Sequence, residues 1–198
     1  MPRRSNRREL IIDVATQRFL ISGYDVVTVD ELCELTNSTK GSFYHFFTNK
    51  ESLAVDVVNE VWRQTQLQLD EIFSTEASPV EQLANEISRV ASHFQRFEGR
   101  RYFVGCQVGT LAVGLRGKSP KMTRRLNFAL THMRQFYHRA FAEGLESGEL
   151  ISKLPAADLA DRFQISLQGL TALGKTYSSS SIKIKGMANQ LQRALKEE

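Results

Sequence analysis

Small, polar and basic side chains that suit contacts with DNA follow one another from Thr39 to Ser42. Lys40 and Ser42 can bond base edges or phosphate oxygens, and Gly41 lets the backbone approach a double helix closely. These residues begin a short predicted helix, so they would stand at the end of that helix that meets the bases. The pattern predicts a recognition helix. The alternative is the solvated face of a small helical bundle.

Four further side chains around this helix could hold phosphate groups. Tyr44 and His45 follow the proposed base contacts by one turn and carry a hydroxyl and an imidazole. Thr28 begins the preceding helix, where free backbone amides favour an anion, and Lys50 begins the following helix. We expect these groups to position the recognition helix on the DNA backbone.

The amino terminus is rich in arginine, with Arg3, Arg4, Arg7 and Arg8 among the first eight residues and no acid between them. Such a set would add phosphate contacts and salt dependence to DNA binding, or would reach the adjacent minor groove. For each single arginine the alternative is a disordered, solubilising tail.

Short helices in the first 48 residues must hold these side chains in place. Apolar residues at spacings of three and four predict a first helix that ends at Gly23. A capping box at Thr28 and Glu31 starts a second helix over residues 29–35, and a third helix follows at residues 39–46. The short turn between these two predicts a helix-turn-helix.

The rest of the chain continues the helical periodicity, and cap and proline signals mark several of the helix starts. We predict an all-α chain of nine helices without a sheet. The six remaining helices are expected at residues 50–73, 78–97, 103–115, 119–147, 155–177 and 185–196.

The run from Thr28 to Leu53, above all KGSFYHFFTNKESL at residues 40–53, resembles the signature of TetR-family transcriptional repressors. The resemblance implies a TetR-like fold with a helix-turn-helix DNA-binding domain at residues 1–48 and a regulatory domain at residues 49–198. It also implies a homodimer that binds a palindromic operator in double-stranded DNA.

By the same resemblance, the DNA contacts divide into two groups. The positions that face bases in the family match Lys40, Gly41 and Ser42. The positions that hold phosphates match Thr28, Tyr44 and Lys50.

The resemblance further implies that the last two helices of each subunit pair into a four-helix dimer interface. Small residues on the first of these helices would permit close approach. The apolar stripes assigned to the interface are Leu159, Phe163, Leu167 and Leu170 on one helix and Met187, Leu191, Ala194 and Leu195 on the next. The alternative is that both stripes pack only within the subunit.

Gly105 and Cys106, followed by small residues, resemble one branch of the family. Some members of that branch sense electrophiles or hypochlorous acid through this cysteine, and others bind ordinary metabolites. Such sensors can pair the cysteine with a lysine on the eighth helix, which matches Lys175 here. A nearby ammonium would favour the reactive thiolate. The alternative for Cys106 is inert packing in the core, which we also expect for Cys33.

Aromatic side chains gather in the carboxy-terminal two thirds, where the resemblance implies a pocket for a small apolar or electrophilic effector. Seven of them form the candidate effector pocket: Phe94, Tyr102, Phe103, Phe128, Phe136, Tyr137 and Phe163. Such a stripe also serves as ordinary core. His132 and His138 do not share a helix face, and no cluster has zinc-ligand spacing, so we expect neither metal nor cofactor.

Composition narrows the function classes further. The 198 residues include 26 lysines and arginines, 22 acids and 41% hydrophobic residues, which allows a real core and a mild positive charge. Two cysteines build no disulfide framework, and the chain has neither a signal-peptide pattern nor an apolar run that could cross a membrane. We therefore expect a cytoplasmic regulator that contacts no membrane. The alternative from another class is a small helical enzyme with Cys106 as nucleophile and a histidine base.

Overall fold

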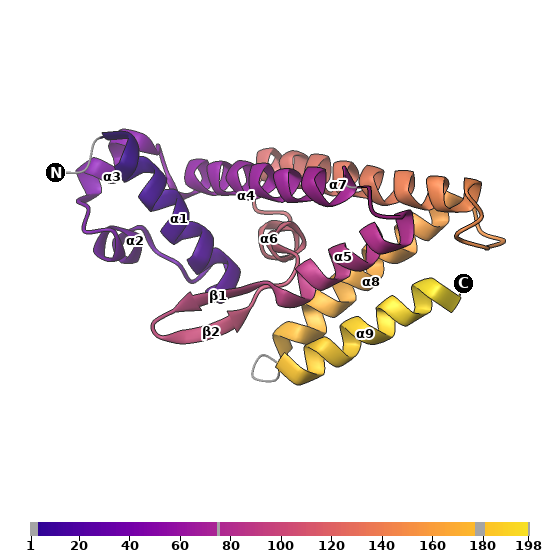
Figure 1. Cartoon of the computed structure of the whole chain (residues 1–198). Coiled ribbons are helices and arrows are strands. Elements are labelled where there is room, and N and C mark those ends of the chain that lie inside the picture. Colours follow the sequence, from indigo (N-terminus) through magenta and orange to yellow (C-terminus); the bar gives the residue numbers. More distant parts are fainter. Residues whose placement is uncertain (1–3, 75, 177–180, 198) are drawn as a thin grey trace.

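The computed structural model describes residues 4–74, 76–176 and 181–197, which form nine α-helices and one antiparallel hairpin (Figure 1). The elements are α1 (Arg4–Ser22), α2 (Val29–Leu35), α3 (Lys40–Phe46), α4 (Lys50–Phe73), α5 (Pro79–Ser92), β1 (Phe94–Phe97), β2 (Arg100–Phe103), α6 (Gln107–Leu115), α7 (Pro120–Glu146), α8 (Ala156–Thr176) and α9 (Ser181–Glu197). The expected all-α class is confirmed for the described residues.

Helices α1, α2 and α3 form the helix-turn-helix head that the sequence predicts. Thr28 caps α2, because its hydroxyl oxygen accepts a hydrogen bond from the Glu31 amide at 3.1 Å. Thr39 caps α3 in the same way, with the Ser42 amide at 3.1 Å. Asn37 takes a left-handed conformation with φ of 48°, which closes the turn between the two helices. The two caps therefore fix where α2 and α3 begin, and the turn at Asn37 separates them.

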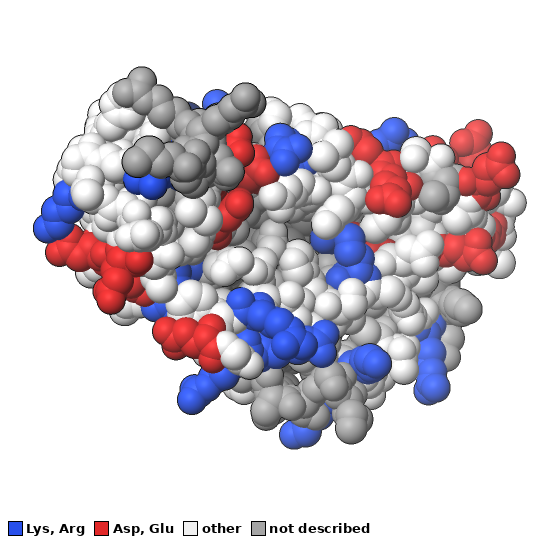
Figure 2. Space-filling view, turned by 60° about the vertical axis from the view of Figure 1, so that its left-hand side comes forward, with Lys and Arg blue, Asp and Glu red and all other residues white. Residues whose placement is uncertain are grey.

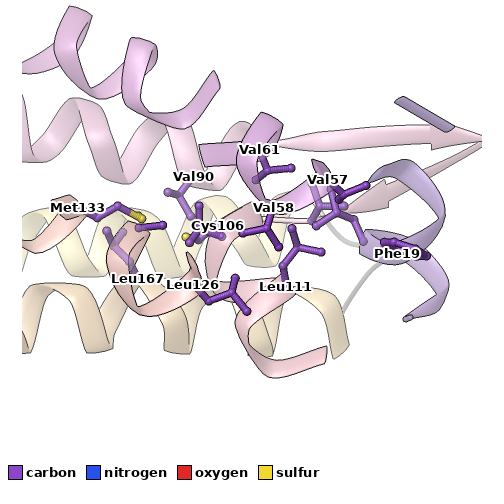
Figure 3. Close-up of a cluster of buried hydrophobic side chains, with 14 of the residues drawn as sticks. Phe19, Val57, Val58, Val61, Val90, Cys106, Leu111, Leu126, Met133 and Leu167 are labelled. Atoms are coloured by element: carbon purple, nitrogen blue, oxygen red, sulfur yellow. The ribbon is translucent and has the colours of Figure 1, made fainter. Parts of the chain in front are cut away.

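The long helix α4 joins the head to the body of the molecule. A capping box starts it, in which the Asn49 side chain accepts from the Ser52 amide at 2.8 Å and the Ser52 hydroxyl accepts from the Asn49 amide at 3.2 Å. Figure 3 shows Val57 of α4 close to Phe19 of α1, and Val61 further along the same buried cluster. One apolar core therefore continues from the head into the body.

The body is a bundle in which α7 packs between α4 and α8, and α9 packs against α5 (Figure 1). The short helix α6 contacts α1, α4, α7 and α8, so it lies where the head meets the bundle. Helix α6 therefore connects the first helix of the head to the helices of the bundle.

The prediction of no sheet is wrong for residues 94–103. Strands β1 and β2 pair antiparallel, with Phe94 opposite Phe103. The two-residue turn consists of Glu98 and Gly99, and both have positive φ, 49° and 74°, as tight hairpin turns require. Phenylalanines at this spacing fit a helix as well as a hairpin, so periodicity alone misassigned the segment.

Two helix boundaries change with it. Helix α5 ends at Ser92 rather than near Phe97, and α6 begins at Gln107 rather than at Phe103. Gly105 has a φ of 55°, and a Cβ there would lie 2.6 Å from the Thr171 hydroxyl. The chain therefore turns sharply at this glycine, close against α8, before α6 starts.

Candidate nucleic-acid interface and regulatory cavity

Helix α3 turns its polar side to solvent and its aromatic side to the core. Phe43 is fully buried, whereas Tyr44 is 53% exposed. The predicted DNA contacts that are exposed on this helix and its cap are Thr39, Lys40, Gly41, Tyr44 and His45, and Ser42 is half-buried. Since residues three and four apart share a helix face, the structure brings this set together on one accessible side.

Lys40 is held only loosely in the free protein. Its ammonium pairs with the Asp30 carboxylate of α2 at 2.8 Å, and the two side chains are 63% and 68% exposed. The hydrogen bond and charge of Asp30 raise the pKa of Lys40, so the lysine stays cationic. Exposed pairs of this kind contribute little to stability, so a base edge or phosphate can replace Asp30 as the partner.

Lys50 has intramolecular partners that the sequence does not suggest. Its ammonium donates to the backbone carbonyls of Tyr24 at 2.8 Å and Val27 at 2.7 Å, and it lies 4.2 Å from the centre of the Tyr24 ring. Burial lowers the pKa of this lysine. In the free protein Lys50 ties the connection between α1 and α2 to the start of α4, and its phosphate contact stays a prediction.

The arginines of the amino terminus differ from one another. Arg3 lies outside the described residues, and Arg4 begins α1, with its side chain not described. Arg7 is half-buried, and Arg8 pairs with Asp56 of α4 at 2.6 Å. The guanidinium of Arg8 also lies 5.5 Å from the centre of a head aromatic ring. The solubilising-tail alternative is therefore wrong for Arg8, which fastens α1 to α4.

Basic side chains are not confined to the head. Arg96, Arg100 and Arg101 on the hairpin are exposed. Figure 2 shows Lys and Arg gathered in the lower middle of one face, with Asp and Glu toward its two ends. Attraction to DNA therefore depends on local groups rather than on a uniformly basic surface.

Cys106 is a buried thiol at the start of α6. Its side chain is 1% exposed, and Figure 3 shows it within the buried apolar cluster that includes Val58 and Val90. The sulfur accepts hydrogen bonds from the Gly109 amide and from the Gln168 side-chain amide, each at 3.4 Å. Burial raises the pKa of this thiol despite these bonds, so the protonated form is favoured.

The expected pairing of Cys106 with Lys175 is not what the structure shows. The Lys175 ammonium donates to the backbone carbonyl of Leu20 in α1 at 2.9 Å. The charged groups that influence the thiol are Arg89 and Glu86, and burial outweighs both. The expectation of a thiolate stabilised by Lys175 is therefore wrong for this conformation.

A buried polar cluster beside Cys106 escaped the sequence analysis. The Glu86 side chain is 0% exposed, and its oxygens accept from Arg89 Nε at 2.7 Å and Nη2 at 2.8 Å. The Tyr137 hydroxyl donates to Glu86 at 3.0 Å, and burial together with the Glu86 charge raises the pKa of Tyr137 well above its usual value. In the sequence, only the three-residue spacing of Glu86 and Arg89, which puts both on one helix face, could have indicated this cluster.

Two of the histidines, His93 and His132, make contacts within the fold. His93 lies 3.0 Å from the Gln107 side-chain amide, and burial followed by the Arg89 charge lowers the pKa of His93 to about 4. The His132 ring contacts the Phe128 carbonyl at 2.8 Å. Across residues 4–74, 76–176 and 181–197, no group of three or more His, Cys, Asp or Glu side chains is arranged to hold a metal ion.

The seven aromatics expected to form an effector pocket pack mainly against one another and against the core. Tyr137 and Phe163 are buried edge to face with ring centres 4.9 Å apart, and Phe94 meets Phe103 across the hairpin at 5.2 Å. Phe128 is 46% exposed on α7. None of the seven lines a cavity of about 760 Å³ that lies elsewhere in the body.

That cavity, of about 760 Å³, lies between α1, α6, α7 and α8. Most of its wall is apolar or small, and the polar groups come mainly from α6 and α8. The lining residues are Phe19, Ile21, Ser22, Gly23, Gly109, Thr110, Ala112, Val113, Gly114, Leu130, Ile165, Gln168, Gly169, Thr171, Ala172 and Lys175. We call this space the α1–α8 cavity. The small residues that shape it carry no signal in helical periodicity, which is why sequence reasoning missed it.

The apolar stripe assigned to the dimer interface on α8 is wrong. Leu159, Phe163, Leu167 and Leu170 are between 1% and 4% exposed within one subunit, because this face of α8 packs on α7 and α5. On α9, Met187 and Leu191 pack partly against the same core, and the side chains of Ala194 and Leu195 are not described. The large apolar residues that α8 exposes are Ile165 at 70% and Leu173 at 48%.

Residues 11–57 match the family model described as bacterial regulatory proteins, tetR family. The chain is 31% identical over 113 residues to the HTH-type transcriptional regulator YxaF of Bacillus subtilis (strain 168), covering 57% of this chain and 58% of YxaF. It is 26% identical over 163 residues to the HTH-type transcriptional repressor DhaR of Mycobacterium sp. (strain GP1), covering 82% of this chain and 79% of DhaR. The match to YxaF thus spans a little over half of that protein.

Solved structures share the whole fold. A TetR-family transcriptional regulator from Agrobacterium tumefaciens superposes with a TM-score of 0.85 at 13% identity, covering 97% of this chain and 98% of that one. The reduced form of E. coli NemR superposes with a TM-score of 0.80 at 18% identity, covering 95% and 96%. In the described part of the present chain, no helix is both long and apolar enough to span a membrane.

Proposed function

We propose that this chain, a TetR-family transcriptional regulator by its head, its fold and its relatives, is a homodimeric repressor that binds a palindromic operator in the cytoplasm. The observation that carries the proposal is helix α3. It buries Phe43 while the caps and the turn before it hold Lys40, Gly41 and Tyr44 toward solvent. A helix so placed suits the major groove.

Dimerisation follows from the number of contacts that one head can make. A single seven-residue helix reaches few base edges, and helix-turn-helix dimers read two half-sites roughly 34–36 Å apart. The exposed Ile165 and Leu173 of α8, with the small Gly169 and Ala172 between them, offer an apolar strip for pairing. We assign the dimer contact to this strip and to the solvent side of α9. Ile165, Gly169 and Ala172 also line the outer edge of the α1–α8 cavity, so a partner subunit would cover that edge.

Sequencing the genomic DNA fragments retained by the purified protein tests the proposal. We expect a two-fold symmetric sequence, bound by two subunits. On that duplex, Tyr44→Ala should weaken binding to all sequences and flatten the salt dependence, whereas Lys40→Ala should relax the sequence preference. A monomer at micromolar concentration, with or without this duplex, would contradict the proposal.

Release from DNA has two candidate triggers, a small-molecule effector and chemical change at Cys106. The thiol caps α6, so an oxygen or a covalent adduct on the sulfur would disturb its bonds to Gly109 and Gln168. NemR, whose solved form is described as reduced, shares the fold. Against this, burial keeps the thiol protonated, which favours a metabolite effector with Cys106 inert.

Oxidation separates the two triggers. Brief exposure to hypochlorous acid should release wild type but not Cys106→Ser if the thiol is the sensor, and Cys33→Ser should respond like wild type. Equal loss of DNA by wild type and Cys106→Ser leaves the effector as the trigger. The thiol-enzyme alternative gains no support from the contacts of the sulfur, which are with Gly109 and Gln168, or from the relatives, which are transcriptional regulators.

A further inference from the structure

Lys175 forms no ion pair with a carboxylate in the described part of the chain. Its side chain reaches into the wall of the α1–α8 cavity, and its one hydrogen-bond partner among the described residues is the neutral carbonyl of Leu20. Burial alone accounts for its lowered pKa, and no carboxylate of the described chain acts on it. The ammonium therefore keeps a positive charge that an anion entering the cavity could pair with.

The rest of the cavity wall shows what kind of molecule would bring that partner. None of the lining residues is an acid, and Lys175 is the charged residue among them. The volume of about 760 Å³ lies in the range of pockets for small ligands, roughly 300–1,000 Å³. Phe19, Ala112 and Leu130 offer an apolar surface. An anionic head with a hydrocarbon tail matches both features.

We propose that the α1–α8 cavity binds a small apolar carboxylic acid, with its carboxylate on Lys175 and its tail against α6, α7 and α8. This proposal deepens the repressor function above, because it names the class of effector and the place where it acts. The aromatic residues first considered for that role are not part of this site.

The hydrogen bond between Lys175 and Leu20 explains how an acid bound in the cavity would affect the DNA-binding head. Leu20 lies in the last turn of α1, where backbone carbonyls lack helical partners, and the Lys175 cation stabilises that end of the helix. A bound carboxylate would compete for the ammonium and place negative charge near the carboxyl end of α1, where it is unfavourable. Binding would therefore weaken the hold of α8 on the first helix of the head.

Calorimetric titration of the full-length protein with octanoate and with octanamide tests the site, because the two share a tail and differ in charge. We expect octanoate to bind wild type at least tenfold more tightly than octanamide. In Lys175→Met this preference should vanish, with the octanamide affinity unchanged within twofold. Lys121→Met, which removes an exposed lysine of α7, is the matched control and should behave as wild type.

Equal affinities of wild type for the two compounds would overturn the proposal, and so would a Lys175→Met protein that keeps the preference. Lack of binding by every straight-chain acid from butanoate to decanoate would overturn it as well. If Lys175→Met does not fold, Lys175→Gln replaces it, and the comparison on wild type stands regardless.

Operator binding separates this proposal from the repressor function. Octanoate should release wild-type protein from its operator duplex. The operator binding of Lys175→Met should be the same with and without octanoate. If the protein binds DNA but octanoate neither binds nor releases it, only the effector proposal fails. If the protein binds no DNA while octanoate binds through Lys175, only the repressor function fails.

Discussion

Replacing Glu86 by alanine should destabilise the protein far more than replacing Glu60 by alanine, although each acid bonds an arginine three residues further along its helix. Glu86 is 0% exposed, and Arg89 beside it is 16% exposed. The Tyr137 hydroxyl donates to the same carboxylate at 3.0 Å. The alanine variant would leave a guanidinium and a hydroxyl in the core without their acceptor.

The expected loss follows from that burial. Breaking a buried ion pair by removing one partner costs about 3–5 kcal/mol, and the lower end applies here because Arg89 keeps a bond to Gln68 at 2.9 Å. Glu60 and Arg63 have the same spacing and a two-pronged contact of 2.7 and 2.9 Å, but their side chains are 29% and 59% exposed. In Glu60→Ala, water therefore replaces most of the stabilisation that this exposed pair supplies.

Urea unfolding followed by far-ultraviolet circular dichroism measures both variants, at one protein concentration because a dimer gains stability with concentration. The midpoint of Glu86→Ala should fall well below that of wild type, and the midpoint of Glu60→Ala should stay close to it. Similar midpoints for the two variants would refute the argument, since burial is the main difference between the pairs.

Three other expectations rest on the surroundings of single residues. Gly174→Ala should cost about 1–3 kcal/mol in urea unfolding, because an added Cβ would lie 2.3 Å from the buried Phe103 ring, whereas Gly114→Ala meets open space and should cost nothing. Equal losses would show that the close approach is unimportant. The pKa of His93 is lowered to about 4 in the folded protein, so as the pH falls this histidine is protonated in the unfolded chain before it is protonated in the folded one. Stability should drop from pH 6.5 toward 4 less steeply in His93→Gln than in wild type, and parallel curves would contradict this. Lys50→Met should speed proteolysis of the segment between α1 and α2, which its two carbonyl bonds hold, and unchanged cleavage there would rule out that role.

The head was predictable because its signals are local. Thr28 and Thr39 cap the helices that follow them, and Asn37 closes the turn, all within a few residues. Phe43 is buried as its place in the helical pattern indicates. The polar face of α3 then follows from helix geometry alone.

Features that depend on distant residues were not predictable in this way. Lys175 bonds Leu20, which is 155 positions away, and no pattern in either segment announces the contact. Helix α8 is apolar on two sides, so spacing could not decide whether Leu167 or Ile165 faces the subunit core. The hairpin was missed because Glu98 takes a positive φ that non-glycine residues seldom adopt.

The unbroken apolar cluster from Phe19 through Val57 to the bundle has a consequence for how the molecule melts and moves. A head that shares its core with the body has no separate melting transition, so a single cooperative unfolding step is expected for the whole subunit. It also has no free hinge at the start of α4. Any change in head position must carry buried side chains from one close-packed arrangement to another, and such arrangements are few and discrete.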